Sequence, residues 1–264
     1  MLINLRQLFR YRGLIQTLVV RDVKVRYRGS ILGFFWSFIN PLLLLLVYTF
    51  VFSVVLKGFR PVDIEPYALF LFCGLLPWTW FSSALLESSN SLIVNSNLIK
   101  KVLFPAEVLP IVSVLSHMVH FVLALPILVI FIVFYGKSLQ LIELIWFPVV
   151  ILVQLVLTIG LALFLSALTV HFRDVRDLLS NVLTLWFFAT PIIYPMSMVP
   201  SAGKFMMDLN PFSHLAIAYQ EILFFDGHFG HWKWLLVLLV VSIVLFMCGY
   251  ALFDRLRDSF AEEV

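Results

Sequence analysis

The chain is a series of long apolar runs separated by short polar breaks. Six runs approach or exceed the roughly 20 residues that a helix needs to cross a bilayer. They cover residues 32–56, 67–86, 108–135, 141–170, 178–194 and 234–253. The pattern predicts an all-α polytopic membrane protein with six transmembrane helices, built as one transmembrane domain over residues 1–264.

The segment of residues 1–29 combines apolar positions at helical spacing with many basic residues. Leu5, Leu8, Ile15 and Leu18 recur at intervals close to whole helical turns, and seven Arg and Lys residues lie among and after them. We expect an amphipathic interface helix on the cytoplasmic surface of the membrane. A solvated basic flank of the first span explains the same segment equally well.

The longest polar connection, residues 190–233, lies between the fifth and sixth predicted spans. It contains four prolines, and its most apolar part, residues 215–225, is too short and too polar to cross a membrane. Irregular backbone at membrane depth is tolerated only where protein or water covers it. We therefore expect short re-entrant helices here, which form an outer gate region.

The distribution of charge predicts the orientation. With the N-terminus inside and six alternating spans, thirteen of the 18 Lys and Arg residues lie on the cytoplasmic side. These are the seven in residues 1–29, together with Lys100, Lys101, Arg173, Arg176, Arg255 and Arg257. Cytoplasmic loops carry an excess of basic residues, so both termini are expected in the cytoplasm.

Composition leaves little room for chemistry outside the membrane. Hydrophobic residues make up 62% of the chain and charged residues 12%, whereas soluble domains are about a quarter charged. Cys73 and Cys248 lie in different apolar runs, so neither a disulfide nor a metal set is indicated. His117 and His120 share one face of the third predicted span, but no third ligand accompanies them, which favours packed neutral histidines over a metal site.

The polar break at residues 95–107 is the most informative segment. It carries Lys100 and Lys101, followed by Phe104 and Pro105. An exposed aromatic can fill an apolar cleft, a proline stiffens the turn, and lysines can pair with acidic groups of a partner. The segment is interpreted as a cytoplasmic docking loop. The alternative is an ordinary loop whose lysines meet anionic lipid headgroups.

A second charged motif precedes the fifth predicted span. Arg173, Asp174, Arg176 and Asp177 alternate in sign and can form ion pairs at helical spacing. The simpler interpretation is the start of a helix whose dipole favours acidic residues in the first turn. The alternative is an interface that changes with the state of a partner, and the simpler interpretation is slightly favoured.

Three segments, taken in order, carry a family resemblance. They are residues 21–33, which lead into Trp36 and Asn40-Pro41; residues 98–105, with Pro110; and residues 171–178, followed by residues 190–195 and Asn210-Pro211. Across six predicted spans, this set resembles the ABC-2 family of ABC-transporter permeases. The likeness is greatest to the branch that exports O-antigen, capsular polysaccharide and teichoic acid.

The resemblance implies a homodimeric permease in the bacterial cytoplasmic membrane that moves a lipid-linked polysaccharide outward. It also implies a separate ABC ATPase in two copies that binds ATP and Mg, because the chain lacks a G-x-x-x-x-G-K-[ST] loop. No cofactor and no nucleic acid are expected for this chain. In the family, the N-terminal helix and the loop after the second span contact the ATPase, which here designates Arg10, Arg12, Lys100, Lys101, Phe104 and Pro105.

A polysaccharide path needs flat faces on which a sugar polymer can slide. Trp36, Tyr48, Phe81 and Tyr194 are candidates for such faces, although core or lipid-facing positions explain each of them as well. Glu87, near the inner end of the second predicted span, is a further candidate, because ionisable groups in the membrane are costly and often functional. The alternative is that Glu87 stays hydrated at the inner interface.

Two other functions remain open at this point. The same fold could export a small hydrophobic compound. Less favoured is an intramembrane enzyme that transfers glycans, which would need a convergent acid, base or metal cluster. Only Glu87, His117 and His120 qualify as members, and nothing in the sequence brings them together.

Overall fold

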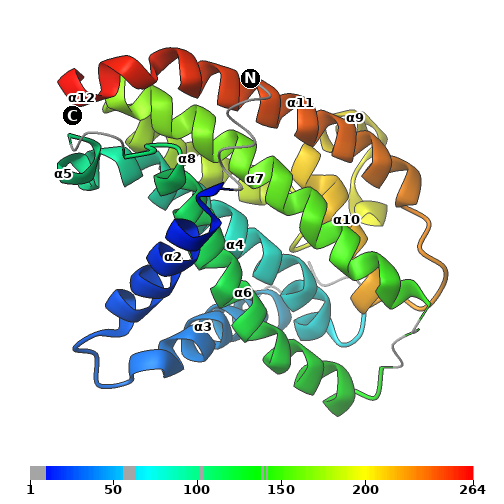
Figure 1. Ribbon diagram of the computed structural model, residues 1–264. Coiled ribbons are helices and arrows are strands. Elements are labelled where there is room, and N and C mark those ends of the chain that lie inside the picture. The colour runs from blue at the N-terminus through cyan, green and yellow to red at the C-terminus, as the bar shows by residue number, and fades with distance from the viewer. Residues whose placement is uncertain (1–9, 56–63, 101–103, 138–139, 141, 264) are drawn as a thin grey trace.

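The computed structural model describes residues 10–55, 64–100, 104–137, 140 and 142–263, and every regular element in these ranges is helical (Figure 1). Four helical stretches are long and apolar enough to cross a membrane. They comprise α4 (Tyr67–Val94), α6 (Val108–Phe134), α7 (Trp146–His171) with the 3₁₀ turn before it, and α11 (Trp232–Leu256) with the 3₁₀ turn after it. The all-helical membrane fold is therefore confirmed.

The first and fifth predicted spans are shorter than the pattern suggested. The first is α3 (Trp36–Phe50), which continues as a π-helical turn through Val51–Val55. The fifth is α8 (Val175–Phe188), only 14 residues long. It ends before Thr190-Pro191, because proline cannot continue a helix and disfavours helical backbone in the residue before it. Four spans are supported by length and composition, and the count of six stays a prediction.

The connection at residues 190–233 is partly helical, and re-entry of its helices into the membrane stays a prediction. It contains α9 (Ser201–Leu209) and α10 (Pro211–Leu223), which meet at Asn210. The Asn210 side chain accepts a hydrogen bond from the Phe212 backbone N–H, and Pro211 occupies the first helical position, which together fix the start of α10. Most of α10 is buried against α4, α7 and α11. How deeply it enters the membrane stays a prediction.

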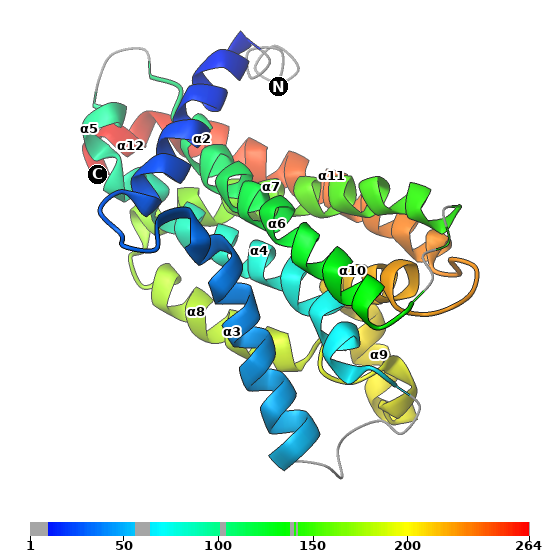
Figure 2. The same cartoon turned by 90° about the horizontal axis from the view of Figure 1, so that it is seen from below.

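The N-terminal basic segment contains the helix α2 (Arg12–Tyr27); residues 1–9 of the predicted interface helix lie outside the described residues. One side of α2 does not face water or lipid, because Leu18 is buried against Val108 and Val112 of α6. Figure 2 shows α2 lying across the first half of α6, with α3 continuing from its far end. The surface helix is thus packed on the bundle.

Two short helices lie at one end of the bundle. Figure 1 shows α5 (Ser96–Ile99) beside α12 (Phe260–Glu263), near the C-terminus. Buried Phe260 joins a small core with Leu92, Tyr250 and Phe253. The loop predicted to dock a partner therefore begins from a packed end of the bundle.

Helices α7 and α11 make the most extensive helix contact among the described residues and run side by side in Figure 1. Gly160 and Gly249 face each other across this contact. A Cβ atom added to Gly249 would lie 2.2 Å from the Gly160 carbonyl oxygen, and one added to Gly160 would lie 2.7 Å from Phe246 backbone. Small residues allow helix backbones to approach closely in membranes. Neither position has room for a larger residue.

We predict that Gly249→Ala separates α7 from α11 and destabilises the protein by about 1–3 kcal/mol, the usual cost of overpacking. Thermal unfolding in detergent measures the effect. Gly13→Ala in α2 is the matched control, because nothing lies within 4 Å of an added Cβ there. A Gly249→Ala protein as stable as the Gly13→Ala protein would contradict the close helix contact.

Candidate functional site

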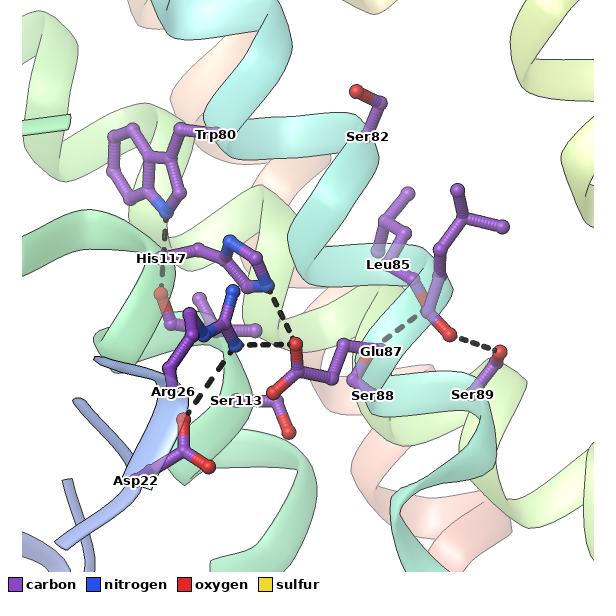
Figure 3. Close-up of polar contacts among 12 residues, drawn as sticks. Asp22, Arg26, Trp80, Ser82, Leu85, Glu87, Ser88, Ser89, Ser113 and His117 are labelled. Carbon is purple, nitrogen blue, oxygen red and sulfur yellow. Dashed lines mark hydrogen bonds and ion pairs between the residues drawn. The ribbon is translucent and has the colours of Figure 1, made fainter. Parts of the chain in front are cut away.

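Three charged or titratable side chains meet where the helices α2, α4 and α6 pack together (Figure 3). Arg26 of α2 places Nη2 2.5 Å from Oε2 of Glu87 on α4. His117 of α6 places Nε2 2.9 Å from the same carboxylate oxygen. We refer to Arg26, Glu87 and His117 as the charged link, because it joins α2, α4 and α6 at one point.

Neighbours in the sequence set the surroundings of Arg26 and of Glu87. Asp22 precedes Arg26 by one helical turn, and its carboxylate lies 3.7 Å from the guanidinium. The serines after Glu87 bond within their own helix: Ser88 and Ser89 donate to the carbonyls of Leu85 and Leu86 (Figure 3). The hydroxyl protons of these serines are therefore already used within α4, and the Glu87 carboxylate takes its partners from other helices.

The carboxylate of Glu87 needs these partners. Its side chain is 36% exposed and that of Arg26 32% exposed, so both are partly withdrawn from solvent. A charge removed from water is costly unless it is paired and hydrogen-bonded. The Arg26 guanidinium neutralises the carboxylate. A carboxylate only accepts, so the imidazole nitrogen of His117 that faces it carries the proton.

Two cavities lie beside the charged link. The larger, of about 830 Å³, lies between α2, α4 and α6 and extends to the start of α8. Its polar lining includes Arg21, Asp22, Glu87, Asn90, His117 and Arg176.

The smaller cavity, of about 320 Å³, is lined by residues that include Arg26, Trp36, Asn40, Trp80, His117 and His120. His117 lines both spaces, while Glu87 faces the first and Arg26 the second. The charged link, together with Ser83, which also lines both cavities, therefore lies between them. Amides, charged groups and indole rings together are suited to binding the hydroxyl groups and flat faces of sugars.

Among the predicted path residues, Glu87 and Trp36 line cavities, whereas the other aromatics pack. Phe81 is fully buried, with its ring 5.4 Å from that of Trp186. Tyr48 packs against Phe187 of α8, with ring centroids 5.5 Å apart. The Tyr194 hydroxyl donates to the carbonyl of Phe188. Their role in a path stays a prediction.

The structure does bring Glu87 and His117 together, although no sequence pattern predicted this contact. His120 lies one turn further along α6, with its ring centroid 6.0 Å from that of His117, and its Nδ1 is 3.3 Å from the Ser37 hydroxyl. No group of three or more potential metal ligands occurs among the described residues. The Glu87 carboxylate is already paired with Arg26, which disfavours a free acid or base.

Arg26 and Asn90 were not among the candidates from sequence. A signal for Arg26 was present, because Asp22 and Arg26 are one turn apart in an otherwise basic helix. Nothing in the sequence marks Asn90.

The predicted coupling residues lie around the N-terminal half of α2 and the loop before α6. Arg10, Arg12 and Lys100 are exposed, Lys101 lies outside the described residues, and Pro105 is half-buried. Phe104 packs on the small core formed by Leu18, Val108 and Val112. This aromatic ring joins the loop to α2, and its availability for a partner stays a prediction.

The charged motif at the start of α8 is exposed at all four positions: Arg173, Asp174, Arg176 and Asp177. No ion pair joins these four residues to one another in the described part of the chain. Asp177 lies in the first turn of α8, where the helix dipole favours an acid. Arg176 reaches the larger cavity. These positions agree with a helix start.

A second polar cluster holds the other end of the bundle together. His214 of α10 donates from Nε2 to the Asp208 carbonyl, so its Nδ1 accepts from Nε2 of His231, 2.9 Å away. The Glu221 carboxylate accepts from the backbone N–H groups of Gly230 and His231. These bonds fix the turn into α11. Burial, together with the nearby His214, lowers the pKa of His231 to about 4.

The fold defines a multi-pass membrane protein of four spanning-length helices with a basic helix packed at its N-terminal side. The chain belongs to the ABC-2 type transporter family, whose family model matches residues 13–224.

Named relatives cover almost the full chain. The O-antigen export system permease protein RfbA of Myxococcus xanthus is 41% identical over 98% of each chain. The RfbA protein of Klebsiella pneumoniae is 34% identical over 98% of this chain and 96% of its own. The polysialic acid transport protein KpsM of Escherichia coli is 24% identical over 93% of each chain.

The low pKa of His231 makes stability depend on pH. The unfolded histidine titrates near 6.5, so above that pH neither state takes the proton and stability is unaffected. As the pH falls towards 4, the unfolded state takes the proton first. We predict a loss of about 2 kcal/mol at about pH 5 relative to neutral pH.

Thermal unfolding of the wild type and of His231→Asn at the two pH values checks this prediction. The variant should lose less stability on acidification. Burial raises the pKa of Glu221, whose proton uptake acts in the opposite direction, and this contribution is present in both proteins. His228→Asn, at an exposed histidine, is the control. Equal acid sensitivity of the wild type and His231→Asn would show that His231 is not held neutral.

Proposed function

We propose that this chain is the transmembrane subunit of an ABC transporter that exports a lipid-linked polysaccharide, of the O-antigen kind, across the bacterial cytoplasmic membrane. The observation that carries the proposal is the 41% identity over nearly the whole chain to an O-antigen export permease. A separate ABC ATPase in two copies would bind ATP and Mg and drive the cycle. Both termini would lie in the cytoplasm.

The two cavities support a sugar substrate over a small hydrophobic one. Their walls carry Asn90, Asn40, Trp36 and Trp80 beside the charged link. An apolar compound would offer no hydrogen bonds to the amides of Asn40 and Asn90, whereas both indole N–H groups already donate within the protein. A glycan offers hydroxyl groups to the amides and flat faces to the indoles.

The exposed side of α3 and α8 supports a second copy of the chain. The two helices contact each other through Tyr48 and Phe187. On α8, Asn181 and Thr184 are exposed on one face, one turn apart. Polar groups that face hydrocarbon are unfavourable, so a neighbouring copy or a polar path is expected to cover this face.

We predict that deletion of the gene removes the polysaccharide from the cell surface, while the lipid-linked polymer accumulates inside. The reason is that synthesis precedes export, so loss of the permease blocks only the second step. Extraction and quantification of both pools measure the result, and a plasmid copy of the wild-type gene is the control.

Two other outcomes would contradict the proposal. Absence of the polymer from both pools would favour a glycan-transferring enzyme. Normal amounts in both pools would favour an exporter of a small hydrophobic compound.

A further inference from the structure

A long apolar groove lies on the side of α2 away from the larger cavity. Its volume is about 760 Å³, and its walls come from α2, α6, α7 and α11. On α2 the lining positions are Arg12, Ile15, Gln16, Val19 and Val20, which fall on one face at helical spacing. This face therefore presents an apolar stripe with two polar residues near its N-terminal end.

The opposite wall is a second apolar stripe, on α6. It runs from Ile111 to Leu123, and it includes Val119 and Val122. Twelve residues of helix rise about 18 Å, which is close to the ~15 Å depth of hydrocarbon in one leaflet. Ile159 of α7 and Phe246 of α11 close the floor. The groove thus has the length of an extended hydrocarbon chain.

Water cannot fill such a space in a membrane protein without losing hydrogen bonds, because the walls offer almost no partners. Apolar side chains at its edge remain open, with Val20 46% and Val122 45% exposed. These side chains are more favourably covered by hydrocarbon than by water. The occupant therefore has at least one acyl or similar chain.

The charges at the groove select the headgroup. Arg12 is exposed and has no ion pair in the described part of the chain. Arg10 lies two residues before it in the sequence. No acidic residue lines the groove. Basic residues beside a membrane surface attract anionic lipids. A phosphate on a hydrocarbon chain satisfies both the basic end and the apolar walls.

We propose that the groove between α2 and α6 binds one anionic phospholipid, with an acyl chain between the two apolar stripes and its phosphate at Arg12. The bound lipid acts as a wedge that supports α2 against α6 on the side opposite the charged link. This site is separate from both polar cavities. It goes beyond the proposed export function, because a lipid of the surrounding membrane is the ligand.

Native mass spectrometry of the protein released from nanodiscs of mixed phosphatidylglycerol and phosphatidylethanolamine tests the proposal. Wild-type protein should retain phosphatidylglycerol in preference. Arg12→Gln should reduce the preference about fivefold, as expected for the loss of one basic side chain at a charged surface. Arg28→Gln, at an exposed residue outside the groove lining, is the charge control and should keep the preference.

A second pair of variants tests the acyl stripe independently. Val119→Trp combined with Val122→Trp should fill the groove and remove bound lipid of either headgroup. Val129→Trp combined with Val133→Trp, at exposed positions of α6 outside the lining, should leave binding unchanged.

Three results would overturn the proposal. The first is the absence of headgroup selectivity at Arg12, seen either as equal retention of the two lipids by the wild type or as the same lipid preference in Arg12→Gln and Arg28→Gln. The second is a disulfide between two copies carrying Val122→Cys, which would assign the groove to a second copy of this chain. The third is lipid retention that appears only after deletion of residues 2–9, which would assign the groove to the chain's own N-terminal residues.

Discussion

A carboxylate partly withdrawn from water is the constraint around which α2, α4 and α6 are arranged. Glu87 is acceptable within α4 because Arg26 neutralises it and His117 donates to it. These partners come from different helices, so α2, α4 and α6 are held in one relative position. Removal of a single partner leaves a partly buried charge without its counter-ion, which is unfavourable.

Under the proposed function, the charged link offers a route by which a partner bound at the docking loop would act on the cavities. Phe104, in the proposed docking loop, packs on the same small core as Leu18 of α2. Arg26 lies two helical turns beyond Leu18 and touches Glu87, which lines the larger cavity. A partner that moves the loop would displace α2, and α2 cannot shift far without stretching the Arg26–Glu87 pair. The path from loop to cavity wall is therefore short and made of packed or paired side chains.

Much of the fold was predictable from the sequence, because long apolar runs indicate membrane helices directly. Lengths were less predictable: Thr190-Pro191 ends α8 well before the apolar run ends. The charged link was not predictable, because Glu87 is 61 residues from Arg26 and 30 from His117, and only tertiary packing joins them. Likewise the sequence suggested a path role for Phe81, but its full burial depends on the packing of α10, which local patterns do not report.

The central claim, that Glu87 is held by Arg26, is tested most directly by a double-mutant cycle of Arg26→Gln and Glu87→Gln in denaturant unfolding. We expect a coupling energy of about 1 kcal/mol or more, since the two side chains are partly buried and in direct contact. The pair Lys137 and Asp226, whose acid is 64% exposed, is the control and should couple by well under about 1 kcal/mol. Equal coupling in the two cycles would show that the charged link does not hold the helices together.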